Sequence, residues 1–267
     1  MNAMNELLYG QSIALIALVL FVCILFVSEV GFRFGFRRQT KASEAAKSQI
    51  NTIQASMLGL LALLLGFAFS LALQRFDERS QAVVNEANAL GTTYLRTQLL
   101  PASIRTEVQA LLRRYVDIRL EEAHVSLADA ENRQILLANT NKMTDELWAY
   151  AVKAVELDKS AVTSGMFMQS LNDSIDAFGK RDAGLQRHVP ETVVFLLFAT
   201  ILMTAATVGY ASGITGHRAI FATLALQLLI TLVVFLTIDL DRPRRGFIQV
   251  SQFSMQSLQQ SINPAKK

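Results

Sequence analysis

The sequence predicts an all-α membrane protein with four transmembrane helices arranged as two hairpins, and a helical extramembrane domain between the second and third spans. Hydrophobic residues make up 52% of its 267 residues, a larger share than a soluble domain usually has. Four apolar runs each approach or exceed the roughly 20 residues that cross a bilayer core. No run shows the sustained apolar–polar alternation typical of a strand, so we expect helices throughout.

The apolar runs divide the chain into four regions. The spans are expected at residues 7–28, 51–74, 192–216 and 219–238. The stretch 29–50 should form a loop between the first two spans, and the short connection after the third span allows only a hairpin. The regions are a first transmembrane hairpin over 1–74, a helical extramembrane domain over 75–190, a second transmembrane hairpin over 191–240, and a C-terminal tail over 241–267.

The second span is predicted to continue beyond the membrane as one helix, because no proline follows it before Pro101. Its polar continuation carries one apolar stripe at helical spacing. The stripe consists of Phe76, Val83, Ala87, Leu90 and Tyr94. A stripe of this kind needs a packing partner, which could be the domain's own helices or another protein.

The rest of the extramembrane domain is predicted to contain three more helices, over residues 103–124, 128–157 and 164–187. The acidic pair Glu121 and Glu122 is expected to lie on a solvated helix face. The tail after residue 241 carries few apolar residues. It could lie against the domain or remain mobile.

Small residues at four-residue spacing occur in two of the spans. Gly31 and Gly35 form a GxxxG at the end of the first, and Ala205, Gly209 and Gly213 form a strip in the third. Such strips let helix backbones approach closely in lipid. They therefore predict sites of helix–helix contact.

The charge balance and the motif content exclude several classes of function. The net charge is +3, without the clustered basic face of a nucleic-acid-binding protein. The three histidines are far apart, and no HExxH, paired-cysteine, GxSxG or glycine-rich phosphate loop occurs. We therefore expect no enzyme, no catalytic residue, no cofactor and no metal site.

The orientation in the membrane is predicted from the short loops. The first loop carries five Lys and Arg residues, whereas the first ten residues carry none. The positive-inside rule then places both hairpin loops in the cytoplasm and puts the termini and the helical domain on the non-cytoplasmic side. Arg and Lys residues in the C-terminal tail argue for the opposite orientation.

Ionisable residues gather where the second and fourth spans leave the membrane on the same side. This predicted membrane-boundary cluster consists of Arg75, Arg79, Glu86, Asp239, Asp241, Arg242 and Arg245. One hypothesis is that it forms the mouth of an ion pathway. The alternative is interfacial anchoring and helix capping.

Two aromatic residues, Phe67 and Phe69, lie close together in the second span. If identical copies of this helix surrounded an axis, a ring of aromatic side chains could form a hydrophobic constriction that gates by dewetting. The alternative is that these rings face lipid or pack against neighbouring helices.

Three segments carry a family resemblance: LLGFAFSLALQRFDERSQAVVNEANALGTTYLRTQLLP, RRYVDIRL and DLDRPRRGFIQVS. With them the chain resembles the bestrophin-like family of bacterial membrane proteins, also described as a domain of unknown function, and more distantly the bestrophin anion channels. The resemblance implies a multi-pass protein of the bacterial inner membrane, in contact with membrane lipid, that forms a homo-oligomer and conducts an anion. By position it nominates Leu65, Phe67, Phe69 and Ser70 as pore-facing.

The calcium-binding acidic cluster of bestrophins has no counterpart here, because arginines follow Asp239 and Asp241. Two functions remain. The first is an oligomeric anion channel with the second span lining the pore. The alternative is a non-conducting membrane scaffold or sensor whose helical domain binds a protein partner. The oligomeric state separates the two.

Overall fold

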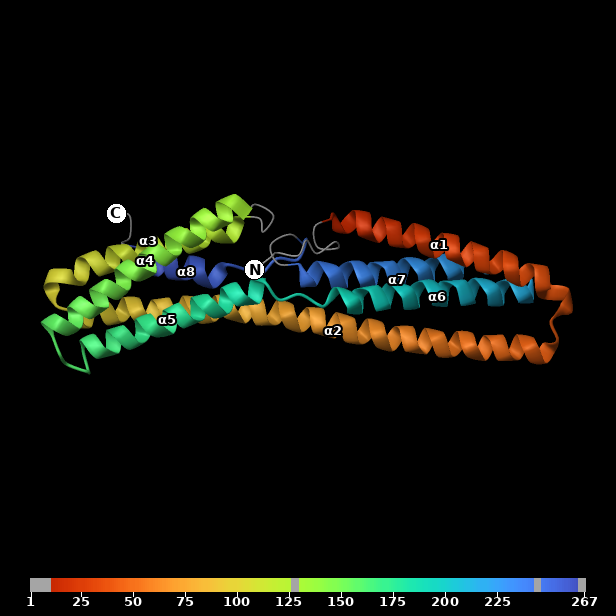
Figure 1. The fold of residues 1–267 in the computed structure, drawn as a ribbon, viewed down its shortest axis with the longest axis horizontal. Coiled ribbons are helices and arrows are strands. Elements are labelled where there is room, and N and C mark those ends of the chain that lie inside the picture. Colours follow the sequence, from red (N-terminus) through yellow and green to blue (C-terminus); the bar gives the residue numbers. More distant parts are fainter. Residues whose placement is uncertain (1–10, 126–129, 243–245, 264–267) are drawn as a thin grey trace. The chain divides into compact units, whose positions relative to one another are not determined.

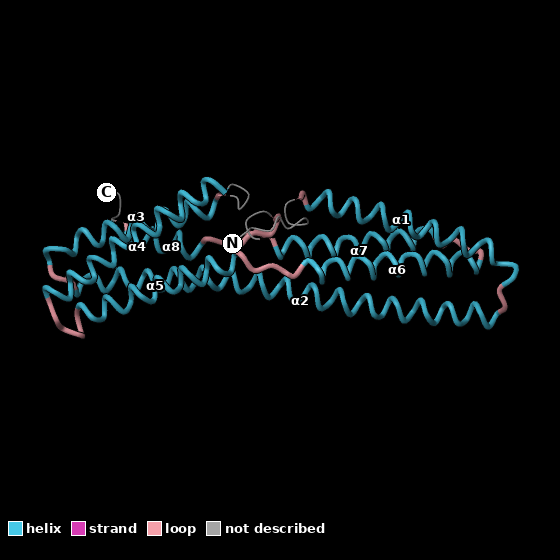
Figure 2. Tube along the Cα trace, in the orientation of Figure 1, coloured by secondary structure: helices cyan, strands magenta, loops and turns pink. Residues whose placement is uncertain are grey.

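A computed structural model describes residues 11–125, 130–242 and 246–263, and every regular element in these ranges is helical (Figures 1 and 2). Two of the elements are short 3₁₀ turns, η1 (Gln39–Lys41) and η2 (Thr97–Leu99). The α-helices are α1 (Ile13–Arg38), α2 (Glu44–Arg96), α3 (Ala102–His124), α4 (Ala130–Leu157), α5 (Ser164–Leu185), α6 (Glu191–Thr215), α7 (Ile220–Asp241) and α8 (Phe253–Ile262). Four of these, α1, α2, α6 and α7, are long and apolar enough to cross a membrane.

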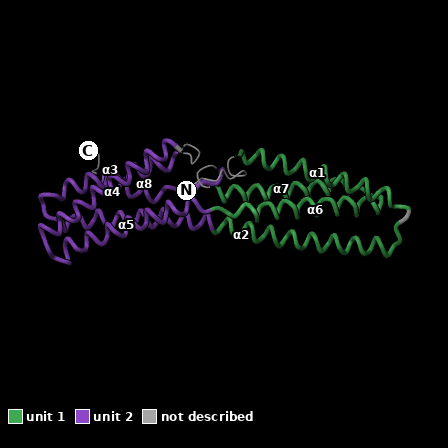
Figure 3. Tube along the Cα trace, in the orientation of Figure 1, with its two compact units in different colours: residues 1–74, 188–242 green, residues 75–187, 243–267 purple. Residues whose placement is uncertain are grey.

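The chain forms two compact units, shown in green and purple in Figure 3. Unit 1 comprises residues 1–74 and 188–242, and therefore holds α1, the apolar part of α2, α6 and α7. Unit 2 comprises residues 75–187 and 243–267, and holds the polar part of α2 together with α3, α4, α5 and α8. Helix α2 is thus one continuous helix of 53 residues that contributes to both cores.

In unit 1, helices α1 and α6 touch backbone to backbone. A Cβ added to any of four glycines would overlap a backbone atom of the other helix, so no larger residue fits there. The glycines are Gly31 and Gly35 on α1 and Gly209 and Gly213 on α6. This contact confirms the expectation that the small-residue strips mark helix–helix packing.

The core of unit 1 is aliphatic and draws on all four of its helices. It includes Ile24 from α1, Leu61 and Leu65 from α2, Ile201 from α6 and Val234 from α7. Since side chains of α2 are part of this core, one face of that helix is committed to its own subunit.

The core of unit 2 is built from α2, α3, α4, α5 and α8. The apolar stripe predicted on α2 packs here through Ala87, Leu90 and Tyr94. The C-terminal tail is not a loose end over its described part, because α8 inserts the fully buried Met255 into the same core.

The loop expected over residues 29–50 is mostly helical, and that prediction was wrong. Helix α1 runs on to Arg38 and α2 begins at Glu44. Both extensions are supported by ion pairs along the helix. Glu29 and Arg33 are 2.9 Å apart, and Glu44 and Lys47 are 2.8 Å apart. Charged residues with long side chains are good helix formers, so these helices need not end where the apolar residues end.

Candidate functional site

Within unit 1, helix α2 has one buried face and one free face. The buried face carries Leu61, Leu65, Ala68 and Ala72, each at most 9% exposed. These residues recur at steps of three and four, which on a helix places them on one side. The opposite side of α2 is not covered by the described part of its own subunit.

The free face carries a continuous stripe of residues that are almost all small or polar. All of them are exposed, and they recur at steps of three and four. We call this the free stripe: Thr52, Ser56, Gly59, Leu63, Gly66 and Ser70. Beside Gly59 and Gly66 an added Cβ would meet only open space.

The composition of the free stripe is unusual for a surface that faces lipid. Lipid-facing positions of spanning helices favour large apolar side chains, since polar groups are expensive in hydrocarbon. Two of the stripe's hydroxyls are satisfied within the helix. Thr52 and Ser56 donate to the carbonyl oxygens four residues earlier, at 3.0 and 2.9 Å. A stripe of small and polar residues suits contact with water or with other helices.

The four residues nominated as pore-facing do not share one face of α2. Ser70 lies on the free stripe, and Phe67 lies beside it with 60% of its surface exposed. Leu65 instead belongs to the core of unit 1. Phe69 is half-buried, and a spacing of two residues turns its side chain about 160° away from that of Phe67. The two rings therefore cannot line the same axis from one helix.

The predicted membrane-boundary cluster is divided between the two units. Arg75, Arg79 and Glu86 lie in unit 2 on α2, and the members from the end of α7 lie in unit 1. Those members are Asp239, Asp241 and Arg242, all three buried, while Arg245 lies outside the described residues.

In unit 1, Asp241 closes the end of the bundle. Its Oδ2 accepts a hydrogen bond from the backbone N–H of Val189 at 2.8 Å, just before α6 begins. Nδ1 of His188 lies 3.2 Å from the Asp241 carbonyl oxygen. Arg242 donates from Nη1 to the carbonyl of Gln11 at 2.5 Å. These contacts fasten the end of α7 to the segments just before α6 and α1, and neither helix start has a side-chain cap.

In unit 2, Glu86 lies at the centre of a buried ionic network. Its Oε1 accepts from Nε of Arg119 at 2.7 Å, and its Oε2 accepts from Nη2 of Arg119 at 3.2 Å and from Nη1 of Arg181 at 2.6 Å. Arg119 also pairs with Glu122. We call these four residues the Glu86 network. It joins α2, α3 and α5 in the interior of unit 2.

Burial and charge act in opposite directions on Glu86. Burial alone would raise the pKa of this carboxyl, but the guanidinium groups of Arg119 and Arg181 outweigh it and hold the pKa below its usual value. Glu86 is therefore ionised at neutral pH. Arg119 also stacks over the Phe178 ring at 4.7 Å, and Arg181 donates to Oε1 of Gln252 at 2.9 Å.

Sequence reasoning missed most of this network. The expectation that Glu122 lies on a solvated face is wrong, because only 1% of it is exposed, whereas Glu121 is exposed as expected. The signal was present in the spacing. Arg119 and Glu122 follow Tyr115 by four and seven residues, so they continue the buried face of α3. A charged residue at a core position predicts a buried ion pair.

Neither unit offers a metal centre within the described residues. No group of three or more His, Cys, Asp and Glu side chains there could hold an ion. The candidate features are the free stripe in unit 1 and, separately, the Glu86 network in unit 2.

Four long apolar helices, together with a second helical unit, define a multi-pass helical membrane protein. The chain belongs to the family of the Bestrophin-like domain, whose model matches residues 9–255. No curated protein matches the sequence.

Solved structures of bacterial membrane proteins share the fold. The chain is similar to a crystal structure of a variant of a bacterial bestrophin homologue from Klebsiella pneumoniae, with a TM-score of 0.64 and 17% identity over 91% of this chain and 96% of that one. A crystal structure of a second variant of the Klebsiella homologue has a TM-score of 0.64 and 16% identity, over 94% of this chain and 96% of that one. A crystal structure of a membrane protein has a TM-score of 0.64 and 16% identity, over 92% of this chain and 97% of that one. At these identities the likeness concerns the fold.

Proposed function

We propose that the protein is an oligomeric ion channel of the bacterial inner membrane, in which the free stripes of α2 from several copies surround the pore. In this proposal α1 with α2, and α6 with α7, cross the bilayer as two hairpins, and unit 2 lies outside the membrane. Membrane lipid surrounds the oligomer. The protein is not an enzyme and acts by letting an ion pass.

The observation that carries the proposal is the free stripe itself. Its hydroxyl and glycine positions are exposed along the apolar part of α2, where contact of the hydroxyl groups with lipid would be costly. Four helices from one chain leave no obvious aqueous path inside unit 1, because their facing side chains fill its core. Copies of the chain around an axis would hide the stripe from lipid and hydrate it.

The choice of ion rests on the bestrophin resemblance, which implies an anion. The free stripe carries no ionised group from Thr52 to Ser70, so neutral hydroxyl groups would meet the ion. Ser70 and Phe67 are the two nominated residues that remain in the proposed lining. Leu65 and Phe69 are left out, because the first is buried in the core and the second is turned away from Phe67.

The orientation in the membrane is part of the proposal. The basic residues between the first two spans favour a cytoplasmic position for that connection, with unit 2 on the other side. Labelling a single cysteine at Asn139, in a Cys23→Ser background, with an impermeant thiol reagent tests this orientation. Labelling only after lysis would reverse it.

The alternative of a scaffold or sensor loses its main support. The apolar stripe on the polar part of α2 suggested a protein partner, but Ala87, Leu90 and Tyr94 pack within unit 2. That stripe therefore needs no other protein to cover it.

The proposal is tested by adding bulk to the free stripe. Gly66→Leu places a side chain where an added Cβ meets only open space, so the subunit should fold. In planar bilayers this variant should lose most of the single-channel conductance. Ala222→Leu places the same side chain at an exposed position on α7 and should conduct like the parent. Equal currents in both variants would remove the stripe from the pore.

Two further measurements complete the test. Phe67→Ala should raise the single-channel conductance if this ring narrows the pore, and an unchanged current would exclude Phe67 from the constriction. Reversal potentials in asymmetric chloride decide between an anion and a cation. A monomer in mild detergent and in native membranes would overturn the proposal as a whole.

A further inference from the structure

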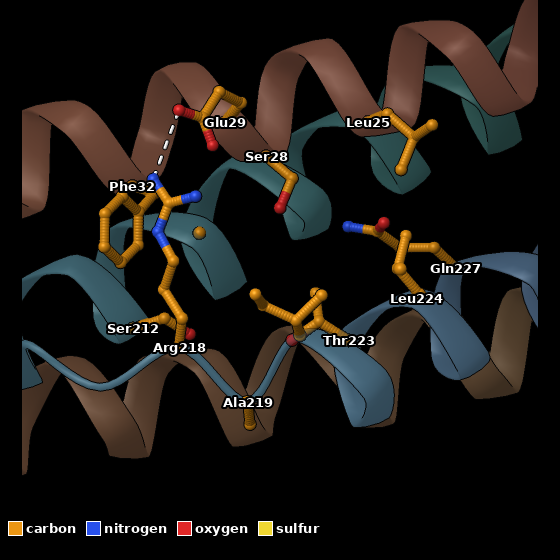
Figure 4. Close-up of a pocket in the computed structure, with 12 residues that line it drawn as sticks. Leu25, Ser28, Glu29, Phe32, Ser212, Arg218, Ala219, Thr223, Leu224 and Gln227 are labelled. Atoms are coloured by element: carbon orange, nitrogen blue, oxygen red, sulfur yellow. Dashed lines mark hydrogen bonds and ion pairs between the residues drawn. The ribbon is translucent and has the colours of Figure 1, made fainter.

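A pocket of about 140 Å³ lies between α1, α6 and α7 in unit 1 (Figure 4). Its lining is mostly apolar, and its polar residues are Ser28, Glu29, Ser212, Arg218, Thr223 and Gln227. The pocket is built from helices of one unit only, and it does not involve the free stripe. Its function is therefore a separate question from conduction.

The side chain of Gln227 is buried and lacks a partner. Only 4% of the residue is exposed, and in the described part of the chain its carboxamide makes no hydrogen bond. Its backbone carbonyl accepts from Thr231, as in an ordinary helix. Figure 4 shows the carboxamide directed into the pocket, towards the space that the Ser28 hydroxyl also faces. Ser28 is 8% exposed and its hydroxyl likewise makes no hydrogen bond in the described residues.

Other hydroxyls in the same helices behave differently. Thr200, Thr204, Thr231 and Thr237 each donate to the carbonyl four residues earlier, at 2.7–2.9 Å. This is the usual way for a hydroxyl to be satisfied in a spanning helix. The Gln227 amide and the Ser28 hydroxyl, both on largely buried residues, have no protein partner among the described residues and border the pocket, so a polar ligand between them would be favoured over an apolar one.

A cation stands at the mouth of the pocket. Nη2 of Arg218 lies 3.2 Å from Oε1 of Glu29, and its guanidinium lies over the Phe32 ring at 3.7 Å. Both charged side chains remain more than one-third exposed, so they can exchange partners. Arg218 precedes α7 directly, at the end of the apolar helices, which is the level of lipid headgroups.

The remaining lining matches a molecule with polar and apolar parts. Gln227 is seven residues into α7, about 10 Å deeper than its start. On the outside of the same helix, Ile220 and Leu224 line the pocket and are also exposed, and Phe221 beside them is 88% exposed. An apolar surface therefore leads from the mouth of the pocket to the bilayer core.

We propose that this pocket binds the headgroup region of a glycerophospholipid. The phosphate pairs with Arg218, and the glycerol and ester oxygens reach the Gln227 amide and the Ser28 hydroxyl. The acyl chains follow the exposed apolar surface of α7 into the bilayer. Ester oxygens would give the Gln227 amide and the Ser28 hydroxyl the partners that they lack, and the phosphate would pair with the guanidinium of Arg218 in place of Glu29.

The test is lipid binding by the delipidated protein, measured by native mass spectrometry with dihexanoyl-phosphatidylglycerol as the probe. The parent should retain the lipid, and Gln227→Leu should bind it about tenfold more weakly, the equivalent of 1.4 kcal/mol. Thr200→Val is the matched control, because its hydroxyl is satisfied within α6, and it should bind like the parent. sn-Glycerol 3-phosphate is titrated in parallel.

Three outcomes would overturn the proposal. Binding of sn-glycerol 3-phosphate as tight as that of the lipid would assign the pocket to a soluble phosphate ester. Equal lipid binding by Gln227→Leu and the parent would remove the amide from the site. Should Gln227→Leu fail to fold, Ser28→Ala and Arg218→Gln replace it, and full lipid retention by both would again refute the site. Each readout is independent of conductance, so its failure leaves the channel proposal standing.

Discussion

Replacing Glu86 by Gln should strongly destabilise unit 2. The change keeps the shape of the side chain but removes its negative charge. The positive charges of Arg119 and Arg181 then stay buried without the carboxylate that neutralises them. Arg119 retains Glu122, whereas Arg181 keeps only the neutral Gln252 and the new amide among the partners described. The larger part of the lost folding stability is therefore expected to come from the uncompensated charge of Arg181.

The size of this destabilisation follows from the three hydrogen bonds that the Glu86 carboxylate accepts, at 2.6, 2.7 and 3.2 Å. Breaking a buried ion pair by removing one partner typically costs about 3–5 kcal/mol, since a charge is left uncompensated. The new amide oxygen can still accept one of these bonds, which favours the lower end of that range. A loss of about 3 kcal/mol corresponds to a fall in Tm of roughly 10 °C for a domain of this size.

Tryptophan fluorescence provides the assay, because Trp148 is the single tryptophan and lies in unit 2. Thermal unfolding in mild detergent is followed for the parent, Glu86→Gln and Glu121→Gln. The last variant is the matched control, since Glu121 is an exposed carboxylate on the neighbouring helix, and it should change the Tm by little.

A double-mutant cycle of Glu86→Gln with Arg181→Met isolates the pair. The loss of unfolding free energy in the double variant should be smaller than the sum of the losses in the two single variants by at least about 1 kcal/mol. The reason is that Arg181→Met removes the positive charge that Glu86→Gln leaves without a partner. Additive losses, or a Tm for Glu86→Gln equal to that of Glu121→Gln, would refute the reasoning.

Three further predictions concern stability. Since the pKa of Glu86 is lowered on folding, the stability that its charge contributes is present above the unfolded pKa of about 4.5 and is lost as the pH falls further. The Tm of the parent should therefore drop below this pH more steeply than the Tm of Glu86→Gln. Parallel curves of Tm against pH for the two proteins would contradict this. Gly209→Ala should disrupt the contact of α1 with α6 at a cost of about 3 kcal/mol, whereas Gly59→Ala should leave the stability unchanged or raise it. The yield of monodisperse protein on gel filtration, compared between the two variants, checks this prediction. Met255→Ala should lower the stability of unit 2 by about 2–5 kcal/mol in the Trp148 assay, and a smaller loss would show that α8 contributes little.

The spanning helices could be predicted because the bilayer imposes a simple rule. A run such as residues 219–238 must be long, apolar and helical to cross, and α7 covers it. The ends of helices follow no such rule. Residues 29–50 are charged but still helical, since helix propensity and pairs such as Glu29 with Arg33 extend a helix past the end of its apolar part.

The candidate sites were harder to predict, for physical reasons that differ. The free stripe was hidden because a uniformly apolar span masks which face its few polar residues share. Arg119 and Arg181 become interpretable only when helices from distant parts of the chain meet at Glu86. The sequence does not predict that Gln227 lies near Ser28, because no local sequence pattern indicates that α7 packs against α1.

The glycine contact between α1 and α6 also restricts how unit 1 can move. With no side chains between the two backbones, a slide of one or two residues would drive a Cβ into a carbonyl group, as at Ser28 and Phe32. Only a step of four residues, about 6 Å, would bring a glycine opposite the same point again. Helices α1 and α6 therefore behave as a fixed frame. Any gating movement within unit 1 has to come from α2 and α7, whose contacts are made by side chains that can repack.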